Sequence, residues 1–238
     1  MHVKEMKMES TLFRVVEILN IHKVSYWVTD GTLLGIVRED RILPWDSDID
    51  IAVWKSEVSM LEVLEIFTKN GFQHIKILPD MDCLHLAIDN IQVDIGFFSE
   101  EGVEASIKWA TRPSEKLDKL IVSFINTIFE NSNINLAYDY KNFFLKIVVK
   151  HTLGLFSYLL TDKIKDRMYA YARNKYLYVG CTYPIDLLNF KKIKFKECEI
   201  VIPKDSCEYL RLCYGDNWRV PNKNYIWTKD TYNLKEFL

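Results

Sequence analysis

Along the first quarter of the chain, the spacing of hydrophobic residues alternates between that of helices and that of strands. Residues 4–22 carry apolar side chains at helical spacing, which predicts an N-terminal helix. The apolar run YWVT at 26–29 predicts a short buried strand, and TLLGIVRE at 32–39 predicts a short helix. Acidic and aliphatic residues then alternate in DIDIAVW at 48–54, which predicts a strand with one polar face. The predicted order is therefore helix, strand, helix, strand.

The next segment has the signals of one more helix followed by a hairpin. Ser56 with Glu57 predicts a helix start, and the helix runs to about Lys69 and ends at Gly71. The dipeptide at 89–90, Asp-Asn, is a hairpin turn signal between two apolar runs. Strands are predicted over FQHIKIL (72–78), CLHLAI (83–88) and IQVDIGFF (91–98).

The pattern changes after Pro113, where Leu, Phe, Tyr and Lys recur at helical spacing. This part predicts helices over 115–131, 139–176 and 204–214, and a strand over 193–202. We therefore expect an α+β fold. Residues 1–113 would form a catalytic core with a mixed sheet flanked by helices. Residues 114–238 would form a mostly helical half that packs on this core and ends in a strand–helix segment.

Composition and charge narrow the class of protein. With 49% hydrophobic and 27% charged residues among 238, the chain has globular rather than disordered composition. Lys plus Arg number 31 and Asp plus Glu number 33, so the net charge is −2. This balance argues against a mainly electrostatic nucleic-acid binder, and we expect no nucleic-acid partner. A phosphate ligand would need a local cationic cluster or a bound metal.

We find no secretory or membrane-spanning signal. The first residues lack an apolar segment. The longest apolar stretch, 143–160, carries Lys146, Lys150 and His151, which argues against a bilayer span. Five cysteines with no C-x-x-C pair indicate reduced thiols, so we expect a cytoplasmic protein. A zinc site, the alternative use of these thiols, would lack the usual paired spacing and would draw on Cys198, Cys207 and Cys213.

Candidate chemistry begins with the sequence Asp48-Ile49-Asp50. Residues i and i+2 of a strand face the same way, so both carboxylates leave one face while Ile49 points to the core. Two close carboxylates repel each other, and a divalent cation relieves the repulsion. Carboxylate oxygens are hard ligands that suit Mg²⁺ or Mn²⁺. The alternative for an isolated Asp-x-Asp is an edge strand with its acids in solvent.

Two neighbouring features favour the metal. Asp94 has the same apolar–Asp–apolar pattern, and a strand beside Asp48 and Asp50 would place a third carboxylate on their face. Gly31 and Thr32 lie at the turn from a strand into a helix, where a phosphate can approach the backbone and the free N–H groups of the helix start. Phosphate at a helix start next to a carboxylate-bound metal is the arrangement of a phosphoryl-transfer site.

The string GTLLGIVREDRILPWDSDIDIAV, residues 31–53, resembles the signature of the LicD family of phosphotransferases, which includes the fukutin-type proteins. VIPKDSCEYLRLCYGDNWRVP, residues 201–221, is similar to the closing segment of that family. The resemblance covers roughly residues 10–100 and 193–222. It implies a nucleotidyltransferase (polymerase-beta-like) fold for the core.

The resemblance also implies an activity and a metal. Family members transfer a substituted phosphate from a cytidine diphosphate donor, such as CDP-choline or CDP-ribitol, to a sugar of a surface glycan or glycolipid. Lipopolysaccharide, capsule and teichoic acid are glycans of this kind. By this resemblance the ligands of Mg²⁺ or Mn²⁺ would be Asp48, Asp50 and Asp94. The third of these would act as ligand, as general base toward the acceptor hydroxyl, or as both.

Further substrate-binding residues are expected around these acids. By the resemblance, Gly31 and Thr32 would meet the donor phosphates and Arg38 would neutralise their charge. Asp46 matches the first acid of the family run and shares the face of the other two, in a weaker role. Lys204 is placed near the cleft by the resemblance alone.

His85 is a candidate from strand alternation, which puts it on the acidic face where it would touch the acceptor; a structural histidine is the alternative. The loop 39–41 is more acidic than in most of the family, which leaves donor and acceptor preference open.

Other functions and partners remain open. One alternative is a nucleotidyltransferase that releases pyrophosphate, and another is an inactive nucleotide-binding protein on the same fold. The aromatic and basic residues of 138–178 fit either a helical core or peripheral contact with the inner face of a membrane. The sequence does not predict an oligomeric state.

Overall fold

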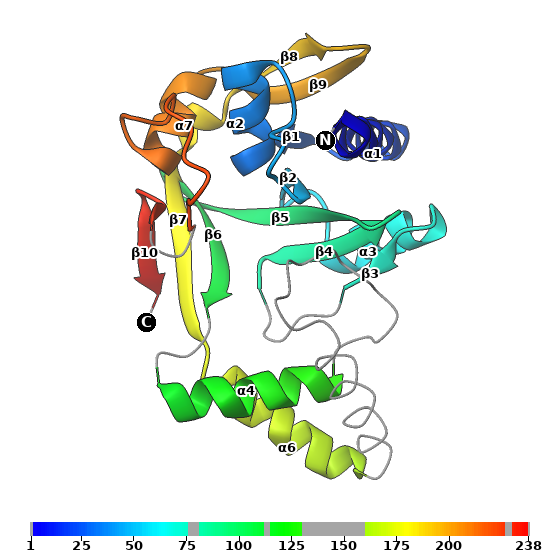
Figure 1. The fold of residues 1–238 in the computed structure, drawn as a ribbon, viewed down its shortest axis with the longest axis vertical. Coiled ribbons are helices and arrows are strands. Elements are labelled where there is room, and N and C mark those ends of the chain that lie inside the picture. Colours follow the sequence, from blue (N-terminus) through cyan, green and yellow to red (C-terminus); the bar gives the residue numbers. More distant parts are fainter. Residues whose placement is uncertain (1, 76–80, 112–114, 130–159, 227–229, 238) are drawn as a thin grey trace.

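The computed structural model describes residues 2–75, 81–111, 115–129, 160–226 and 230–237. Its largest feature is an eight-stranded mixed sheet. The strands are β1 (Tyr26–Val28), β2 (Asp48–Trp54), β3 (Gln73–His74), β4 (Cys83–Ile88), β5 (Ile91–Glu101), β6 (Glu104–Thr111), β7 (Leu177–Pro184) and β10 (Leu234–Phe237). Their order is β1–β2–β5–β6–β7–β10, with β4 also paired to β5 and β3 paired to β4 (Figure 1).

The long strand β5 joins the two parts of this sheet. Its first half pairs in parallel with β2 and antiparallel with β4. Its last residues pair with β6. The turn between β4 and β5 is the predicted hairpin, and both Asp89 and Asn90 adopt the positive φ angles, 51° and 64°, that such a turn requires. The predicted strands at 26–29, 48–54, 83–88 and 91–98 are thereby confirmed.

The helices are α1 (His2–Ile21), α2 (Asp30–Glu39), α3 (Met60–Lys69), α4 (Lys116–Phe129), α6 (Asp162–Arg173) and α7 (Ser206–Tyr214), with a 3-10 turn, η1 (Ile185–Leu188). The helix α1 packs on β2 and β5. It buries Leu12, Val15 and Leu19 completely in the same core as Ile49 and Ile51 of β2. Because side chains alternate along a strand, the acids of β2 lie on its other face.

A second sheet, the hairpin of β8 (Phe190–Phe195) and β9 (Cys198–Pro203), packs beside β1. The rings of Trp27 and Phe190 stack at a centroid distance of 4.8 Å. Helix α7 follows this hairpin and packs on α2. Thr29 Oγ1 and the Tyr209 hydroxyl share a buried 2.7 Å hydrogen bond there. The C-terminal segment is therefore held directly beside the start of α2.

The expectation of a mostly helical C-terminal half is wrong for the described residues. Helices α4 and α6 are present, but β7 and β10 belong to the main sheet, and β8 and β9 form their own. Strand β7 pairs along its length with β6 from the first half of the chain, a long-range contact that local spacing does not encode. Residues 139–159 of the predicted helix lie outside the described residues. Figure 1 shows α4 and α6 at the end of the molecule opposite α2 and α7.

Two local predictions also needed correction. Helix α3 is capped by Ser59, whose Oγ accepts a hydrogen bond from the Glu62 N–H, and not by Ser56. The expected single strand at 193–202 is a hairpin, because Lys196 takes a positive φ of 52° and reverses the chain. A left-handed lysine carries no sequence signal comparable to Asn-Gly or Asp-Gly. The helix ending at Gly215 is confirmed as α7.

Among the described residues, no helix is both long enough and apolar enough to cross a membrane.

Candidate active site

The candidate site lies on the face of the main sheet opposite Ile49 and Ile51, where β2 and β5 run side by side. Strand β2 contributes Asp48 and Asp50, and β5 contributes Asp94, which is the register partner of Asp50. All three side chains are partly buried, whereas the two isoleucines are almost completely buried. The alternation predicted from the sequence therefore orients the acids to one face.

Asp46 joins the two acids of β2. One carboxylate oxygen from each of Asp46, Asp48 and Asp50 lies within 4.8 Å of the others. Three carboxylates this close repel one another when all of them are ionised. Without a cation, the group is therefore compatible with full ionisation only at a high electrostatic cost.

Burial and mutual repulsion raise the pKa values of these acids. The pKa of Asp48 is raised well above its usual value, first by burial and then by the charges of Asp46 and Asp94. The pKa of Asp50 is likewise raised well above its usual value by burial and by the charge of Asp48. Burial raises the pKa of Asp46 as well. A divalent cation among these oxygens would offset their mutual repulsion, so the donor set fits a hard metal ion.

The start of α2 is tied to this group through Thr32. Its backbone N–H donates to Asp50 Oδ2 at 3.1 Å, and its hydroxyl lies 3.3 Å from the same oxygen. In return, the backbone N–H of Asp50 donates to Thr32 Oγ1 at 2.9 Å. Thr32 is completely buried. Its side chain thus holds the Asp50 carboxylate against the helix start.

Gly31 leaves the space that Asp46 occupies. A Cβ at this position would lie 2.5 Å from Asp46 Oδ2 and 3.3 Å from Asp50 Oδ2. The glycine therefore allows the carboxylates to approach the first turn of α2, where the helix dipole favours negative charge. The sequence predicts a donor phosphate near Gly31. In the structure, the carboxylates of Asp46 and Asp50 lie close to the position of a Cβ added at this glycine.

The carboxylate of Asp94 is held by two side chains on its own face of the sheet. Asp94 Oδ1 lies 2.8 Å from His85 Nδ1, and both Asp94 oxygens accept from Gln92 Nε2, at 2.8 and 3.0 Å. Because a carboxylate accepts, the proton of a neutral His85 ring lies on Nδ1. The other nitrogen, Nε2, is buried and has no hydrogen-bond partner among the described residues.

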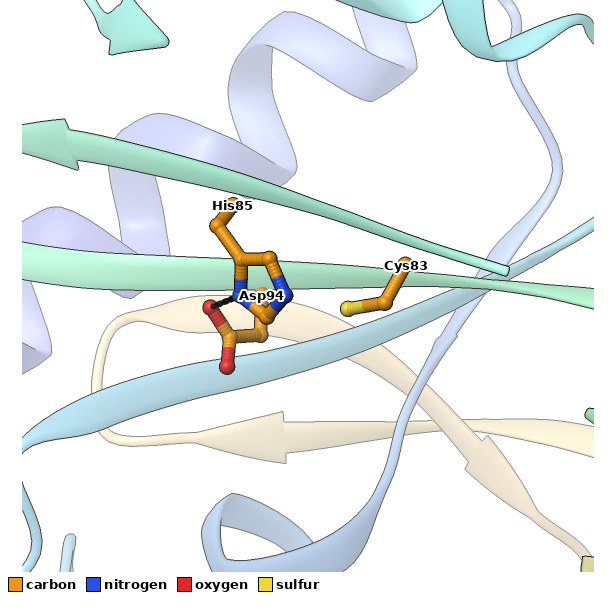
Figure 2. A group of neighbouring side chains, drawn as sticks. All are labelled: Cys83, His85 and Asp94. Atoms are coloured by element: carbon orange, nitrogen blue, oxygen red, sulfur yellow. Dashed lines mark hydrogen bonds and ion pairs between the residues drawn. The ribbon is translucent and has the colours of Figure 1, made fainter. Parts of the chain in front are cut away.

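Cys83 lies on the same face, beyond the His85 ring. Figure 2 shows the ring between the Asp94 carboxylate and the Cys83 sulfur. Ligand atoms of these three residues lie within 4.8 Å of one another. Burial, followed by the charge of Asp94, raises the pKa of the Cys83 thiol well above its usual value. These effects favour the protonated, weakly nucleophilic form of the thiol.

Asp30 is a member of the acidic group that sequence reasoning did not single out. It begins α2 with a positive φ of 44°, unusual for a residue other than glycine. Burial raises its pKa to about 6, and the charges of Asp94 and Asp46 act in the same direction. Its position directly after the β1 strand and before Gly31 was the available signal.

Arg38 lies at the other end of α2 and is held by protein groups. Its Nη2 and Nε donate to Glu39 Oε1 at 2.7 and 3.1 Å, and its Nη1 donates to the Trp218 carbonyl at 3.2 Å. The second Glu39 oxygen accepts from Arg41. These guanidinium groups lower the pKa of Glu39. The acidic loop noted in the sequence is thus neutralised on the protein itself.

Lys204 follows β9, and its side chain is exposed. No hydrogen bond or ion pair of the described residues joins this side chain to the carboxylates, and only its backbone N–H is bonded, to the Asn189 carbonyl at 2.7 Å. The cysteines considered for zinc, Cys198, Cys207 and Cys213, belong to no group of potential metal ligands in the described part of the chain.

Comparisons with known proteins match the part of the chain that carries this site. The family model described as LicD/FKTN/FKRP, nucleotidyltransferase domain matches residues 23–116, the segment that contains the four acids and His85. Residues 23–116 thus carry a nucleotidyltransferase domain of the LicD/fukutin-related kind.

Individual relatives match over short segments. Ribitol 5-phosphate transferase FKRP of Homo sapiens is 40% identical over 50 residues, which are 21% of this chain and 10% of that protein. Uncharacterized protein RP689 of Rickettsia prowazekii is 37% identical over 57 residues, 24% of this chain and 21% of that protein. The matches thus span a tenth to about a fifth of the curated relatives.

A solution structure of the antibiotic-resistance factor ANT(2'')-Ia aligns with 71% of this chain and 93% of its own, at a TM-score of 0.37 and 12% identity.

Proposed function

We propose that this chain is a metal-dependent phosphotransferase. It would move a substituted phosphate, such as phosphoribitol or phosphocholine, from a CDP-linked donor to a sugar hydroxyl of a surface glycan or glycolipid. The observation that carries the proposal is the convergence of Asp46, Asp48 and Asp50 beside the first turn of α2, with Asp94 next to Asp50 on the neighbouring strand. Support for the substituted phosphate comes from the match to FKRP, which is named as a ribitol 5-phosphate transferase.

The carboxylates fit Mg²⁺ or Mn²⁺ better than any other occupant. Four acids on one face repel each other, and no Lys or Arg of the described residues forms an ion pair with Asp46, Asp48 or Asp50. Asp48 and Asp50 would hold the ion, with Asp94 as the third acid and Asp46 in reach of the same position. When bound, the ion would neutralise the donor diphosphate and polarise the phosphorus under attack.

The side chains of the protein would then orient the two substrates. Thr32 keeps the Asp50 carboxylate in one position, which preorganises the site before substrate arrives. His85 and Gln92 fix the plane of the Asp94 carboxylate. An oriented carboxylate on this face can accept the proton of an attacking sugar hydroxyl. The donor phosphates would lie on the bound ion, near the first turn of α2.

Product analysis tests the proposal. The full chain would be incubated with CDP-ribitol or CDP-choline, Mg²⁺ and a panel of saccharides, and released CMP and pyrophosphate would be quantified. We expect CMP, no pyrophosphate, and complete loss of turnover with EDTA. Pyrophosphate release from CTP with a sugar phosphate would replace the proposal by nucleotidyl transfer. No turnover, together with thermal stabilisation by CDP compounds, would replace it by an inactive nucleotide-binding protein.

A further inference from the structure

A shallow cationic cavity lies at the C-terminal end of α2, on the segment that leads into Asp46. It has a volume of about 360 Å³. Its lining combines the end of α2 and the loop that follows it with the segment after α7, through Arg38, Glu39, Arg41, Trp45, Arg219, Pro221 and Lys223. Four of these side chains are cationic and one is acidic. In a chain of net charge −2, this is a local concentration of positive charge.

Glu39, the acidic residue of the lining, does not cancel the positive charge of the cavity. Both Glu39 oxygens are already bound, one by Arg38 and the other by Arg41. Among the described residues, no carboxylate forms an ion pair with Arg219 or Lys223, and both side chains are exposed. The side chain of Arg41 is 38% exposed, so it can contact a ligand while it stays bonded to Glu39. An anion entering the cavity therefore finds three accessible cations.

Trp45 supplies an aromatic surface in the same cavity. It is 37% exposed. The Lys223 ammonium lies 5.4 Å from the centre of its ring, and the Arg38 guanidinium lies 5.9 Å from it. A second depression of about 260 Å³ is lined by Trp45, Arg41, Lys223 and Pro44. An exposed indole among cations suits a ligand that has both an apolar ring face and a negative charge.

The position of the cavity relates it to the candidate active site. Trp45 directly precedes Asp46, whose carboxylate contacts the space at Gly31. The cavity lies toward the C-terminal end of α2, whereas the carboxylates lie at its N-terminal end. A ligand held here would approach the acids from the side of Asp46, away from the first turn of the helix where the donor phosphates are proposed to bind.

We propose that this cavity binds the anionic group of the acceptor, a phosphate or carboxylate carried on a sugar whose ring lies against Trp45. Binding of an anionic sugar depends on the cavity alone. Its role as the acceptor rests on the phosphotransferase function proposed above. Arg41, Arg219 and Lys223 provide the charge-assisted hydrogen bonds, and Trp45 provides the ring contact.

Calorimetric titration of the full chain tests this site without metal or donor. The probes are glucose 6-phosphate, glucuronate, glucose and inorganic phosphate, each at low salt and at 0.5 M NaCl. We expect glucose 6-phosphate, glucuronate or both to bind in a salt-dependent manner, more tightly than glucose or inorganic phosphate. The comparison of the two acidic sugars distinguishes a phosphate from a carboxylate.

Two charge-matched double variants locate the binding. Arg41→Ala with Lys223→Ala should weaken binding of the acidic sugar by at least about tenfold. Lys191→Ala with Lys194→Ala removes the same charge from exposed positions on β8 and should leave binding within about twofold. Equal binding of the acidic sugar by the first variant and the wild type, or binding of glucose as tight as that of both acidic sugars, would overturn the proposal.

A further titration separates the acceptor from the donor. CDP with Mg²⁺ should bind the Arg41→Ala, Lys223→Ala variant as it binds the wild type. A loss of CDP affinity as large as the loss for the acidic sugar would assign the cavity to the donor and overturn the acceptor role. Because the acidic-sugar titration contains neither metal nor nucleotide, its outcome does not depend on whether phosphotransfer is observed.

Discussion

Asp50 and Asp94 are register partners on the parallel strands β2 and β5, so two acids from distant parts of the sequence face the same side of the sheet next to each other. Neighbouring strands are about 4.8 Å apart, so the two residues are adjacent across the strands. In the described part of the chain, the ligand atoms of Asp94 group within 4.8 Å with those of Cys83 and His85, whereas those of Asp50 group with those of Asp46 and Asp48. This relationship connects the acids at the start of α2 to the His85–Asp94 hydrogen bond, and the predictions below test its parts.

The first prediction concerns Asp50→Asn. The amide oxygen can still accept from the Thr32 N–H, so the fold and the start of α2 should be retained. The negative charge is lost, and we expect Mn²⁺ affinity and CMP release to fall by about 100-fold or more. Calorimetric Mn²⁺ titration, CMP quantification and circular dichroism measure the three effects.

The control for this variant is Asp40→Asn, which removes an exposed carboxylate near Lys196 and should change none of these quantities. Metal affinity of Asp50→Asn within a few-fold of the wild type would contradict the assignment of Asp50 as a ligand.

The second prediction is a dependence of metal-free stability on pH. The native-state pKa values of Asp30, Asp48 and Asp50 are raised above the unfolded value near 3.8. Between that value and the native pKa, the native state binds more protons than the unfolded state, so the free energy of unfolding falls as pH rises. For Asp30, a rise from 3.8 to about 6 corresponds to on the order of 3 kcal/mol.

Chemical denaturation at pH 5 and pH 8, with EDTA or with Mg²⁺, measures this effect. In EDTA, we expect the free energy of unfolding to fall between pH 5 and pH 8. In Mg²⁺ this fall should be smaller, because the cation compensates the negative charges of the acids. The fall should also be smaller in Asp50→Asn. Identical pH dependence under all of these conditions would show that the acids do not repel each other in the native state.

The third prediction is that Gly31→Ala disturbs the metal site more than the fold. The new Cβ would lie 2.5 Å from Asp46 Oδ2, and this carboxylate can move away because it is the end of a side chain. We expect a small change in melting temperature and a loss of Mn²⁺ affinity of about tenfold. Gly102→Ala is the matched control, since nothing lies within 4 Å of its added Cβ, although its φ of 66° will cost some stability. Unchanged metal affinity in Gly31→Ala would exclude Asp46 from the metal site.

The fourth prediction separates a positioning role of His85 from a purely structural one. His85→Ala removes the hydrogen bond to Asp94 Oδ1 and should lower kcat by about 10- to 100-fold. His85→Asn places an amide N–H near the position of Nδ1 and should recover part of this loss. CMP release kinetics measure kcat and KM for both variants. If both variants lose the same activity, or if both change only KM, His85 does not act by orienting Asp94.

Much of this site follows from the local sequence. The alternation of DIDIAVW requires Asp48 and Asp50 to share a face, whatever surrounds the strand. The same rule determines which face of its own strand His85 occupies, and likewise for Asp94. The dipeptide Asp89-Asn90 predicts the hairpin that joins these strands, because both residues tolerate the left-handed conformation.

The tertiary structure decided which residues meet. His85 faces Asp94 only in the observed register, since a slip of one residue between β4 and β5 would turn the imidazole to the other side of the sheet. Thr32 and Arg38 are expected at the donor phosphates, and the fold joins Thr32 to the Asp50 carboxylate and Arg38 to the Glu39 carboxylate. Strand β7 was missed because its partner β6 lies far away in the chain.

The sequence by itself therefore determined the acids, the faces they occupy and the helix start beside them, because these depend on the periods of strands and helices. The packing of distant segments decided the pairing of β2 with β5 and the position of α7 beside α2. It also brought Trp45 next to Lys223 in the cationic cavity. Such contacts depend on the burial of side chains from several elements at once, and no local spacing encodes them.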